Sequence, residues 1–204
     1  TIFEKDHKAG GLMRTNIPSF RLPADVLDEE IYRIINMGAE LKLNSYIEKL
    51  KPVIDEYDSV FIGTGAPKGK DLKLKGREIS SENIHIGIDW LTSIAFEHVK
   101  KIGKKVIVIG GGNTAMDCCR SALRLGATDV KVTVRSPFSQ MKASEWEIEE
   151  TMEEGIPILD NTSPKEFLFD DKGKLCGMKF EKMEQVEVDG RKKMQSTGEE
   201  ITIE

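Results

Sequence analysis

The chain has 204 residues, of which 39% are hydrophobic and 32% are charged, and its formal net charge is −5. This composition is typical of a soluble globular protein, and the negative charge argues against a general nucleic-acid binder, which needs a basic face. No apolar run reaches the roughly 20 residues that span a bilayer, and no signal peptide opens the chain. We therefore expect a cytoplasmic protein that contacts neither nucleic acid nor membrane.

Side chains with obvious chemistry give few leads. Cys118, Cys119 and Cys176 are too few for a disulfide framework and lack metal-ligand spacing, so we expect packed thiols and no metal site. The histidines are scattered, and no catalytic residue is assigned. The glutamates within residues 145–154 are expected to form the solvated face of a helix.

The first part of the chain alternates strands, helices and glycine-rich loops. It opens without Met on a strand at 1–4 and closes on an alternating strand at 200–204, as an internal piece of a longer protein would. A loop over Ala9–Pro23 precedes a helix from Ala24 to about Met37, which Gly38 ends. Three further elements are expected: a strand at Leu41–Leu43, a helix over Tyr46–Tyr57 interrupted at Pro52, and a buried strand at Ser59–Ile62.

The rest of the chain predicts an α/β unit followed by antiparallel strands. Residues 67 to about 82 are polar and rich in lysine and glycine, which indicates a connection between two lobes. The expected elements are a helix over Ile88–Val99, a strand at Val106–Ile109, a helix to about Leu125, a strand at Val130–Val134, a helix over Ser144–Glu154 and a strand at Ile156–Leu159. A meander at Phe167–Phe169, Leu175–Met183 and Gln185–Val188 follows, with a turn at Asp170–Gly173.

The clearest motif is the turn Gly110-x-Gly112-x-x-Ala115 between an apolar strand and an amphipathic helix. In a dinucleotide-binding unit the first glycine permits the tight turn, and the second lets the backbone approach the pyrophosphate. The small third residue lets helix and strand pack closely, and the helix start faces the phosphates. A tight turn without a ligand is the alternative. The expected cofactor-binding residues are Gly110, Gly111, Gly112, Asn113, Thr114 and Ala115.

The end of the second strand distinguishes the two nicotinamide cofactors. An acidic residue there would bond the ribose 2′-hydroxyl of NADH and repel a 2′-phosphate. This chain has Arg135, whose guanidinium can bind a phosphate through two hydrogen bonds, and Ser136, whose hydroxyl can add another. The sequence therefore favours NADPH, and a solvated arginine at a strand tip is the alternative.

A second, incomplete nucleotide site is predicted nearer the start. Glu4 ends an apolar strand, where a Rossmann unit places the acidic residue that holds an adenosine ribose. The residues that directly follow another apolar strand suit a loop laid close to a cofactor: Gly63, Thr64 and Gly65. Taken singly, each of these features is more often a simple turn.

Together these motifs resemble a known family. The small (beta) subunit of NADPH-dependent glutamate synthase and related pyridine nucleotide-disulfide-type oxidoreductases has the same order of motifs: Thr1–Glu4, Gly10–Arg14, Ile17–Pro23, Gly63–Ala66, Val108–Asp117, Met141–Ala143 and Glu154-Gly155. The resemblance covers nearly the whole chain. It implies a flavoprotein in which hydride passes from NADPH to FAD and electrons leave through iron–sulfur clusters in missing segments or partners.

The resemblance also implies an organisation. The expected fold class is α/β: a Rossmann-like, three-layer NADPH-binding lobe with a β-meander at 87–204, part of an FAD-binding lobe at 1–66, and a connection at 67–86. It assigns Glu4, Gly10, Gly11 and Arg14 to the FAD side, and the glycine-rich turn with Arg135 to NADPH. The implied partner is an iron–sulfur protein or a protein like the glutamate synthase large subunit.

The sequence departs from the family in places. Family members commonly have two consecutive arginines where this chain has Arg135-Ser136, and the FAD pyrophosphate turn and the cysteine-rich cluster segment are absent from the sequence. We therefore expect this piece alone to be inactive. The alternative function is a non-catalytic domain that binds or senses nicotinamide nucleotides.

Overall fold

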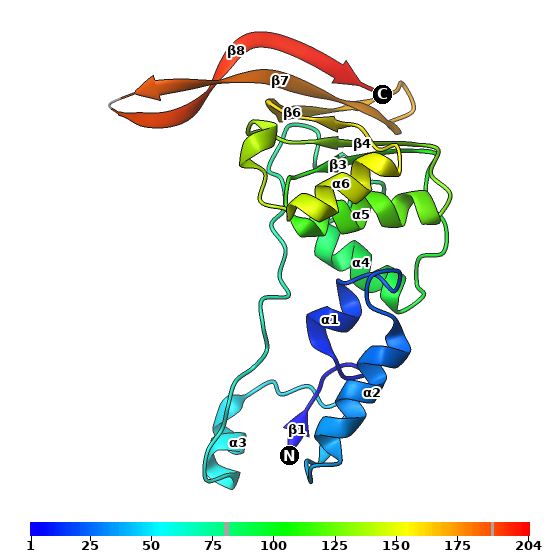
Figure 1. Ribbon diagram of the computed structural model, residues 1–204, viewed down its shortest axis with the longest axis vertical. Coiled ribbons are helices and arrows are strands. Elements are labelled where there is room, and N and C mark those ends of the chain that lie inside the picture. Colours follow the sequence, from blue (N-terminus) through cyan, green and yellow to red (C-terminus); the bar gives the residue numbers. More distant parts are fainter. Residues whose placement is uncertain (80–81, 189) are drawn as a thin grey trace. The chain divides into compact units, whose positions relative to one another are not determined.

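The computed structural model describes residues 1–79, 82–188 and 190–204, and the chain divides into two compact units, Thr1–Lys68 and Gly69–Glu204 (Figure 1). Ser80 and Ser81, which fall in the expected connection, lie outside the described residues. Within the described residues, no helix is long and apolar enough to cross a membrane.

The first unit contains a two-stranded parallel sheet and short helices. Its elements are β1 (Ile2–Phe3), α1 (Gly11–Thr15), α2 (Ala24–Ile35), β2 (Leu41–Lys42) and α3 (Leu50–Glu56). β1 pairs with β2. The strands and the helix expected in the first 43 residues are confirmed, with shorter bounds. α1 lies inside the segment expected to be a loop, where the Thr15 hydroxyl donates to the Gly11 carbonyl.

Two predictions for the first unit are wrong. The apolar run Ser59–Ile62 forms no strand, and Phe61 is 94% exposed. A strand needs a neighbour for its backbone hydrogen bonds, and none of the described strands pairs with this run. The helix expected from Tyr46 begins only at Leu50. Pro52 therefore lies in its first turn, where a missing N–H leaves no hydrogen bond unmade, instead of interrupting the helix.

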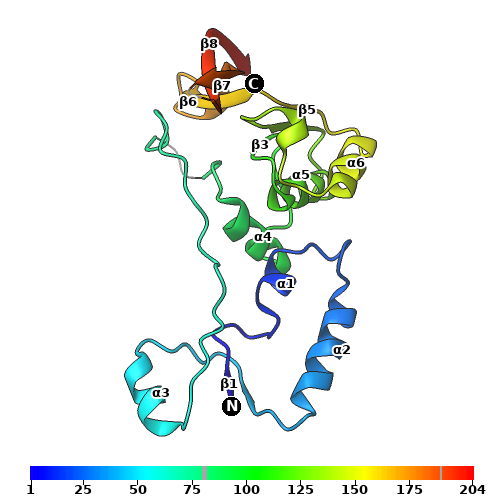
Figure 2. The same cartoon turned by 60° about the vertical axis from the view of Figure 1, so that its left-hand side comes forward.

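The second unit has three layers (Figures 1 and 2). The middle layer is a parallel sheet in the order β3-β4-β5, made of β3 (Lys105–Ile109), β4 (Asp129–Thr133) and β5 (Ile158–Leu159). One face is covered by α5 (Asn113–Arg124) and α6 (Glu145–Glu153), α4 (Gly87–Ala95) packs against α5, and η1 (Phe138–Gln140) precedes α6. The other face is covered by the antiparallel strands β6 (Thr162–Phe169), β7 (Leu175–Val188) and β8 (Arg191–Ile203). This is the α/β, three-layer fold with a β-meander that the sequence predicts.

Alternation along β3 explains the layering. Val106 and Val108 pack into the cluster on the helix side, and Ile107 and Ile109 pack into the cluster that includes Phe180 of the meander. Successive side chains of a strand point to opposite faces, and parallel sheets are normally buried on both. A continuous apolar run such as this one therefore requires a layer on each side.

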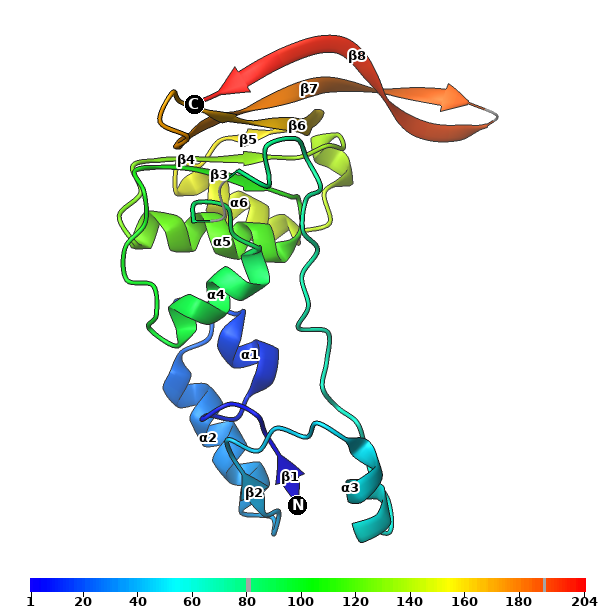
Figure 3. The same cartoon turned by 180° about the vertical axis from the view of Figure 1, so that it is seen from behind.

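The meander differs from the prediction. β7 runs as one strand through Glu184, where the sequence predicts a break, and its register with β8 shifts earlier, between Glu181 and Met183. β8 begins at Arg191, well before the alternating residues at 200–204. Pairing with β6 ends at Thr162↔Lys182, and β7 and β8 continue past β6 as an arm (Figure 3). The β8 part of the arm carries no apolar alternation because no described layer covers it, so the sequence signal for it is weak.

The core position of Phe180 gives a stability test. Phe180 is fully buried between the parallel sheet and the meander. Phe180→Ala should lower the free energy of unfolding by about 3–5 kcal/mol, because the core cannot collapse fully into the cavity. Urea titration followed by tryptophan fluorescence measures this loss. The exposed Phe61→Ala is the control, with an expected change within about 0.5 kcal/mol. Equal losses in both variants would contradict the core assignment.

Candidate nucleotide-binding site

The glycine-rich turn joins β3 to α5. Gly110 has a φ of 140°, which glycine adopts without strain, and its N–H donates to the Thr133 carbonyl at 3.0 Å. The turn therefore begins while the chain is still attached to β4. Ala115 is buried, and its Cβ would lie 3.6 Å from a Cβ added at Gly110. The small third residue thus permits the close approach of helix and strand that the motif predicts.

The other two glycines have different surroundings. A Cβ added at Gly111 would lie 2.8 Å from Val134 Cγ1, so Gly111 is required for packing. At Gly112 no heavy atom lies within 4 Å of such a Cβ, and no side chain caps the start of the 12-residue helix α5. Open space in front of the first N–H groups of a helix suits a phosphate. The residues present therefore fit a dinucleotide pyrophosphate.

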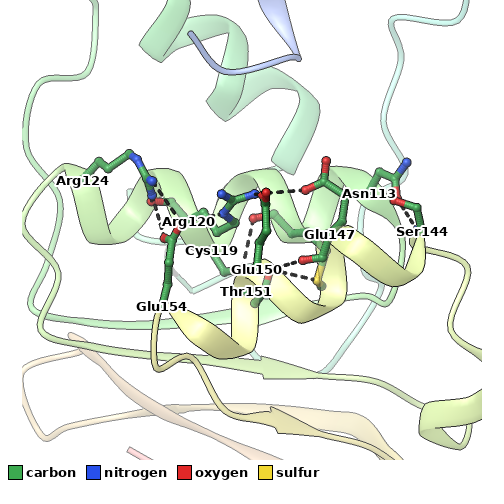
Figure 4. A network of polar contacts seen from close by, with 10 residues as sticks. Asn113, Cys119, Arg120, Arg124, Ser144, Glu147, Glu150, Thr151 and Glu154 are labelled. Carbon is green, nitrogen blue, oxygen red and sulfur yellow. Dashed lines mark hydrogen bonds and ion pairs between the residues drawn. The ribbon is translucent and has the colours of Figure 1, made fainter. Parts of the chain in front are cut away.

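The segment Met141–Ser144 lies directly on this turn. The N–H groups of Lys142 and Ala143 each donate to the Gly111 carbonyl at 2.9 Å. The Ser144 N–H donates to Asn113 Oδ1 at 2.9 Å, as Figure 4 shows. The start of α6 is therefore fastened to the start of α5 by backbone and side-chain hydrogen bonds.

Arg135 lies two residues after Thr133, the last residue of β4, and is exposed. Within the described ranges, no carboxylate forms an ion pair with it, whereas Arg77, Arg120 and Arg124 all have carboxylate partners. Ser136, half-buried, accepts a hydrogen bond at its carbonyl from the Asn161 N–H. The Arg135 guanidinium is thus available for an anion next to the turn.

A cavity of about 920 Å³ runs beside the turn. It follows β3, which lies at the edge of its sheet, and it is lined by Gly110, Gly112, Thr114, Trp90 and Cys118 among others. Nucleotide-sized ligands occupy pockets of this order. The glycines expected to bind the cofactor therefore border a space large enough for one.

A cluster of ion pairs, of which Arg120–Glu147 is buried, joins α5 to α6 (Figure 4). The Arg120 side chain is 7% exposed; its Nη1 lies 3.1 Å from Glu147 Oε2 and 2.6 Å from Glu150 Oε2, and its Nε lies 2.9 Å from Glu154 Oε1. Arg124 Nη1 is 2.7 Å from Glu154 Oε2. Burial works to lower the pKa of Arg120, but the hydrogen bonds and charges of Glu154 and Glu150 outweigh it and raise the pKa.

The same cluster corrects one prediction. The pKa of Glu154 is lowered, mainly by its hydrogen bond from Arg124 and then by Arg120, and Glu147 is fully buried. The expected solvated face of glutamates is therefore wrong for the residues that face α5. Their spacing of three and four residues, opposite two arginines spaced by four, was the available signal.

The thiols differ from one another. Cys118 and Cys119 are buried, as expected, and burial raises the pKa of both, to about 12 for Cys119. These thiols are therefore protonated and unreactive at neutral pH. Cys176 is exposed, so its expected core position is wrong. No cluster suited to a metal ion occurs among the described His, Cys, Asp and Glu side chains.

The site residues expected in the first unit are less organised. Glu4 Oε1 accepts the Asp6 N–H at 2.9 Å, at the end of β1. Gly10 and Gly11 have φ values of 128° and 52°. Arg14 pairs with a carboxylate and donates to a backbone carbonyl, so it serves the unit's own structure. Gly63, Thr64 and Gly65 are exposed and lie outside any helix or strand.

Comparison with known proteins places the chain in a family. The model of the pyridine nucleotide-disulphide oxidoreductase family matches residues 23–203. The chain belongs to this family. The small chain of glutamate synthase [NADPH] from Escherichia coli is 28% identical over 93% of this chain and 43% of its own length, which confirms the resemblance read from the motifs.

Other oxidoreductases of similar sequence or fold extend this result. The NADPH-Fe(3+) oxidoreductase subunit beta of Geobacter sulfurreducens is 32% identical over 100% of this chain and 32% of its own length. Mycobacterium tuberculosis FprA, solved in complex with NADPH, has a TM-score of 0.77 and 16% identity over 98% of this chain and 61% of its own. The likeness to FprA concerns the fold. The chain spans less than half the length of these two curated relatives.

Alanine substitutions at Gly111 and Gly112 should affect different properties, stability in the first case and dinucleotide binding in the second. Gly112→Ala should change the free energy of unfolding by no more than about 1 kcal/mol, because its Cβ meets open space at the start of a helix. It should weaken dinucleotide binding, because that Cβ takes the place of the pyrophosphate. Gly111→Ala should cost about 1–3 kcal/mol of stability through its contact with Val134. Urea titration and calorimetric titration with NADPH measure both effects, and wild-type affinity in Gly112→Ala would refute the pyrophosphate assignment.

Proposed function

We propose that this chain is the NADPH-binding module of a flavin-dependent oxidoreductase. In the whole protein, hydride passes from NADPH to FAD and electrons move onward to iron–sulfur centres, as in the glutamate synthase small subunit. The observation that carries the proposal is the open turn at Gly112, before an uncapped helix, next to an arginine with no described carboxylate partner. That arrangement accepts a pyrophosphate at the turn and a separate 2′-phosphate at the arginine, and the 2′-phosphate is what distinguishes NADPH from NADH.

Each part of the site has a distinct role in this proposal. Gly110, Gly112 and the first N–H groups of α5, at Asn113 and Thr114, hold the pyrophosphate. The middle glycine, Gly111, and the buried Ala115 support the turn by packing. Arg135 and Ser136 hold the 2′-phosphate at the end of β4. The nicotinamide supplies the hydride when bound, and these residues bind and orient it.

The preference for NADPH rests on charge at the end of β4. No acidic residue occupies the position where NAD-binding units place one, and Arg135 occupies it instead. A guanidinium beside an uncapped helix start favours an additional phosphate. The names of the Geobacter and Escherichia relatives specify NADPH, which supports the same cofactor here.

The first unit is proposed to be part of the FAD-binding lobe, at 1–66, joined through 67–86 to the NADPH-binding lobe at 87–204. A parallel sheet is normally buried on both faces, yet this unit has only two strands. Several large apolar side chains of the unit are exposed: Val26, Ile34, Ile54, Phe61 and Ile62. Further flavin-lobe structure would cover such side chains, and Glu4, Gly10, Gly11 and the loop Gly63–Gly65 would then border the flavin nucleotide.

The proposed partner is an iron–sulfur protein or a protein like the glutamate synthase large subunit, in the cytoplasm. Relatives named as a small chain and as a subunit beta support an assembly with other subunits. The second candidate is a domain that only binds or senses the nucleotide. It uses the same turn and differs by having no flavin chemistry.

The cofactor assignment predicts a selective loss in Arg135→Ala. Calorimetric titration should show that the wild-type chain binds NADPH more tightly than NADH. The variant should lose about 1–3 kcal/mol of binding free energy for NADPH, the range for hydrogen bonds to a charged group, and nothing for NADH. Arg191→Ala, an exposed arginine at the start of β8, is the matched control and should bind like the wild type. Equal affinities of the wild type for NADPH and NADH would show that Arg135 does not select the cofactor.

The flavin part of the proposal is tested on the whole natural protein. It should purify with a flavin absorption spectrum, and NADPH should bleach that spectrum without oxygen and drive reduction of an electron-accepting dye. NADPH binding without flavin, and without dye reduction after FAD is added, would favour the sensing domain instead.

A further inference from the structure

We propose that Arg120 is a positioning residue of the nucleotide site, because it holds α6 beside α5 and so fixes Lys142–Ser144 on the glycine-rich turn. Its effect on nucleotide affinity rests on the proposed function. Its effect on the backbone of the turn does not, and the two can be measured separately.

Arg120 lies on the face of α5 that meets α6. It follows Asn113 by seven residues, or two helical turns, so both side chains project from one face. Figure 4 shows Asn113 and Arg120 directed toward Ser144 and the glutamates of α6. The contacts along the two helices therefore form one continuous row.

The order of the contacts shows that the helices run parallel. Asn113 meets Ser144 at the two helix starts, Arg120 meets Glu147 and Glu150 farther along, and Arg124 meets Glu154 near the ends. The two helices also touch where the Thr151 hydroxyl of α6 lies 3.4 Å from Met116 Sδ of α5. Fixing α6 lengthwise on α5 therefore sets where the segment before α6 meets the turn.

Arg120 dominates this row because of its burial. Its guanidinium reaches three carboxylates, and the Glu147 side chain is fully buried. A buried carboxylate is costly without a nearby cation. Arg120 therefore holds Glu147, and with it the start of α6, against α5. Ser144 precedes Glu147 by less than one helical turn, so loss of this tie acts directly on the hydrogen bonds at Gly111 and Asn113.

The segment between β4 and α6 carries Arg135. At one end it is held by the Phe138 N–H, which donates to Asp160 Oδ2 at 2.9 Å, and by the Ser136 carbonyl. At the other end it is held by the contacts of Lys142–Ser144 with the turn. Arg135 lies at the first end, which stays held, so releasing the second end acts on the glycine-rich turn itself, and the cost of ordering the turn is paid on binding. The pyrophosphate contact should suffer most.

The test uses Arg120→Met combined with Glu147→Gln. The double variant removes the cation and the buried negative charge together, so no fully buried carboxylate loses its cation. Glu150 is 44% exposed and stays hydrated, and Glu154 keeps Arg124. Arg124→Met is the matched control, since it removes an arginine of the same row far from the helix starts.

Hydrogen exchange of the amides of Lys142, Ala143 and Ser144 is the first measurement. In the double variant their protection should fall about tenfold or more, while amides of β3 and β4 keep theirs, as expected for local opening. Arg124→Met should resemble the wild type. Unchanged protection at 142–144 in the double variant, or an equal fall throughout β3 and β4, would overturn the proposal.

Nucleotide titration is the second measurement. If the ordered segment is populated about one tenth of the time in the double variant, the Kd for NADPH should rise about tenfold. The Kd for NADH should rise by a similar factor, because both nucleotides share the pyrophosphate contact, and the exchange of β3 and β4 separates this effect from a general loss of stability. A wild type that binds neither nucleotide would refute the proposed function, and exchange at 142–144 would still decide the role of Arg120.

A conservative variant provides the test if the double variant does not fold. Arg120→Lys keeps the charge and loses the fork that reaches three carboxylates. It should show intermediate exchange at 142–144 and an intermediate Kd for NADPH. If the double variant does not fold and Arg120→Lys exchanges these amides at wild-type rates, the proposal is overturned.

Discussion

A parallel sheet leaves neither face to water, and in this chain a sheet of three short strands meets that requirement with a different layer on each face. The valines of β3 face helices that connect the strands, and its isoleucines face the meander. The helices that connect the strands make them parallel, so the strands all end at the same edge of the sheet. Each turn from a strand into a helix therefore lies at that edge, beside the end of the neighbouring strand. The hydrogen bond from Gly110 to Thr133 shows the result, since it joins the turn after β3 to the end of β4. The glycine-rich turn and Arg135 are neighbours for this reason, although Gly110 and Arg135 are 25 positions apart in the sequence.

The sequence predicts those features whose signal is local. The apolar run of β3, the glycines after it, the period of α5 and the turn at Asp170–Gly173 all depend on residues within a few positions of one another, and the structure has each of them. Features that depend on a distant partner were less predictable. The apolar run Ser59–Ile62 resembles β3 in composition but finds no described neighbouring strand. The first half of β8 has a neighbour but no covering layer, and therefore shows no alternation.

The candidate site likewise has features that depend on neighbouring residues in the sequence and features that depend on distant ones. The motif identifies three consecutive glycines but does not distinguish Gly111, which is closed in by Val134, from Gly112, which faces open space. That difference arises from the end of β4 and cannot be read from the turn alone. The glutamates of α6 are a similar case, because a carboxylate is solvated or buried according to what the facing helix presents. Arg120 lies 27 residues before Glu147, and only the packing of α6 on α5 brings the two together.

The buried charges between α5 and α6 are not the strongest way to join two helices. Apolar side chains of similar volume would hold them at least as well, since desolvation offsets much of the attraction between buried ions. Apolar contacts, however, tolerate sliding and rotation, whereas the fork of Arg120 fits its carboxylates in one geometry. The pairing of Asn113 with Ser144 needs α6 at one position along α5, because a shift of a single residue moves the Ser144 N–H out of reach. The cluster at Arg120 therefore supplies longitudinal register more than stability, and the register is what brings the segment before α6 onto the turn.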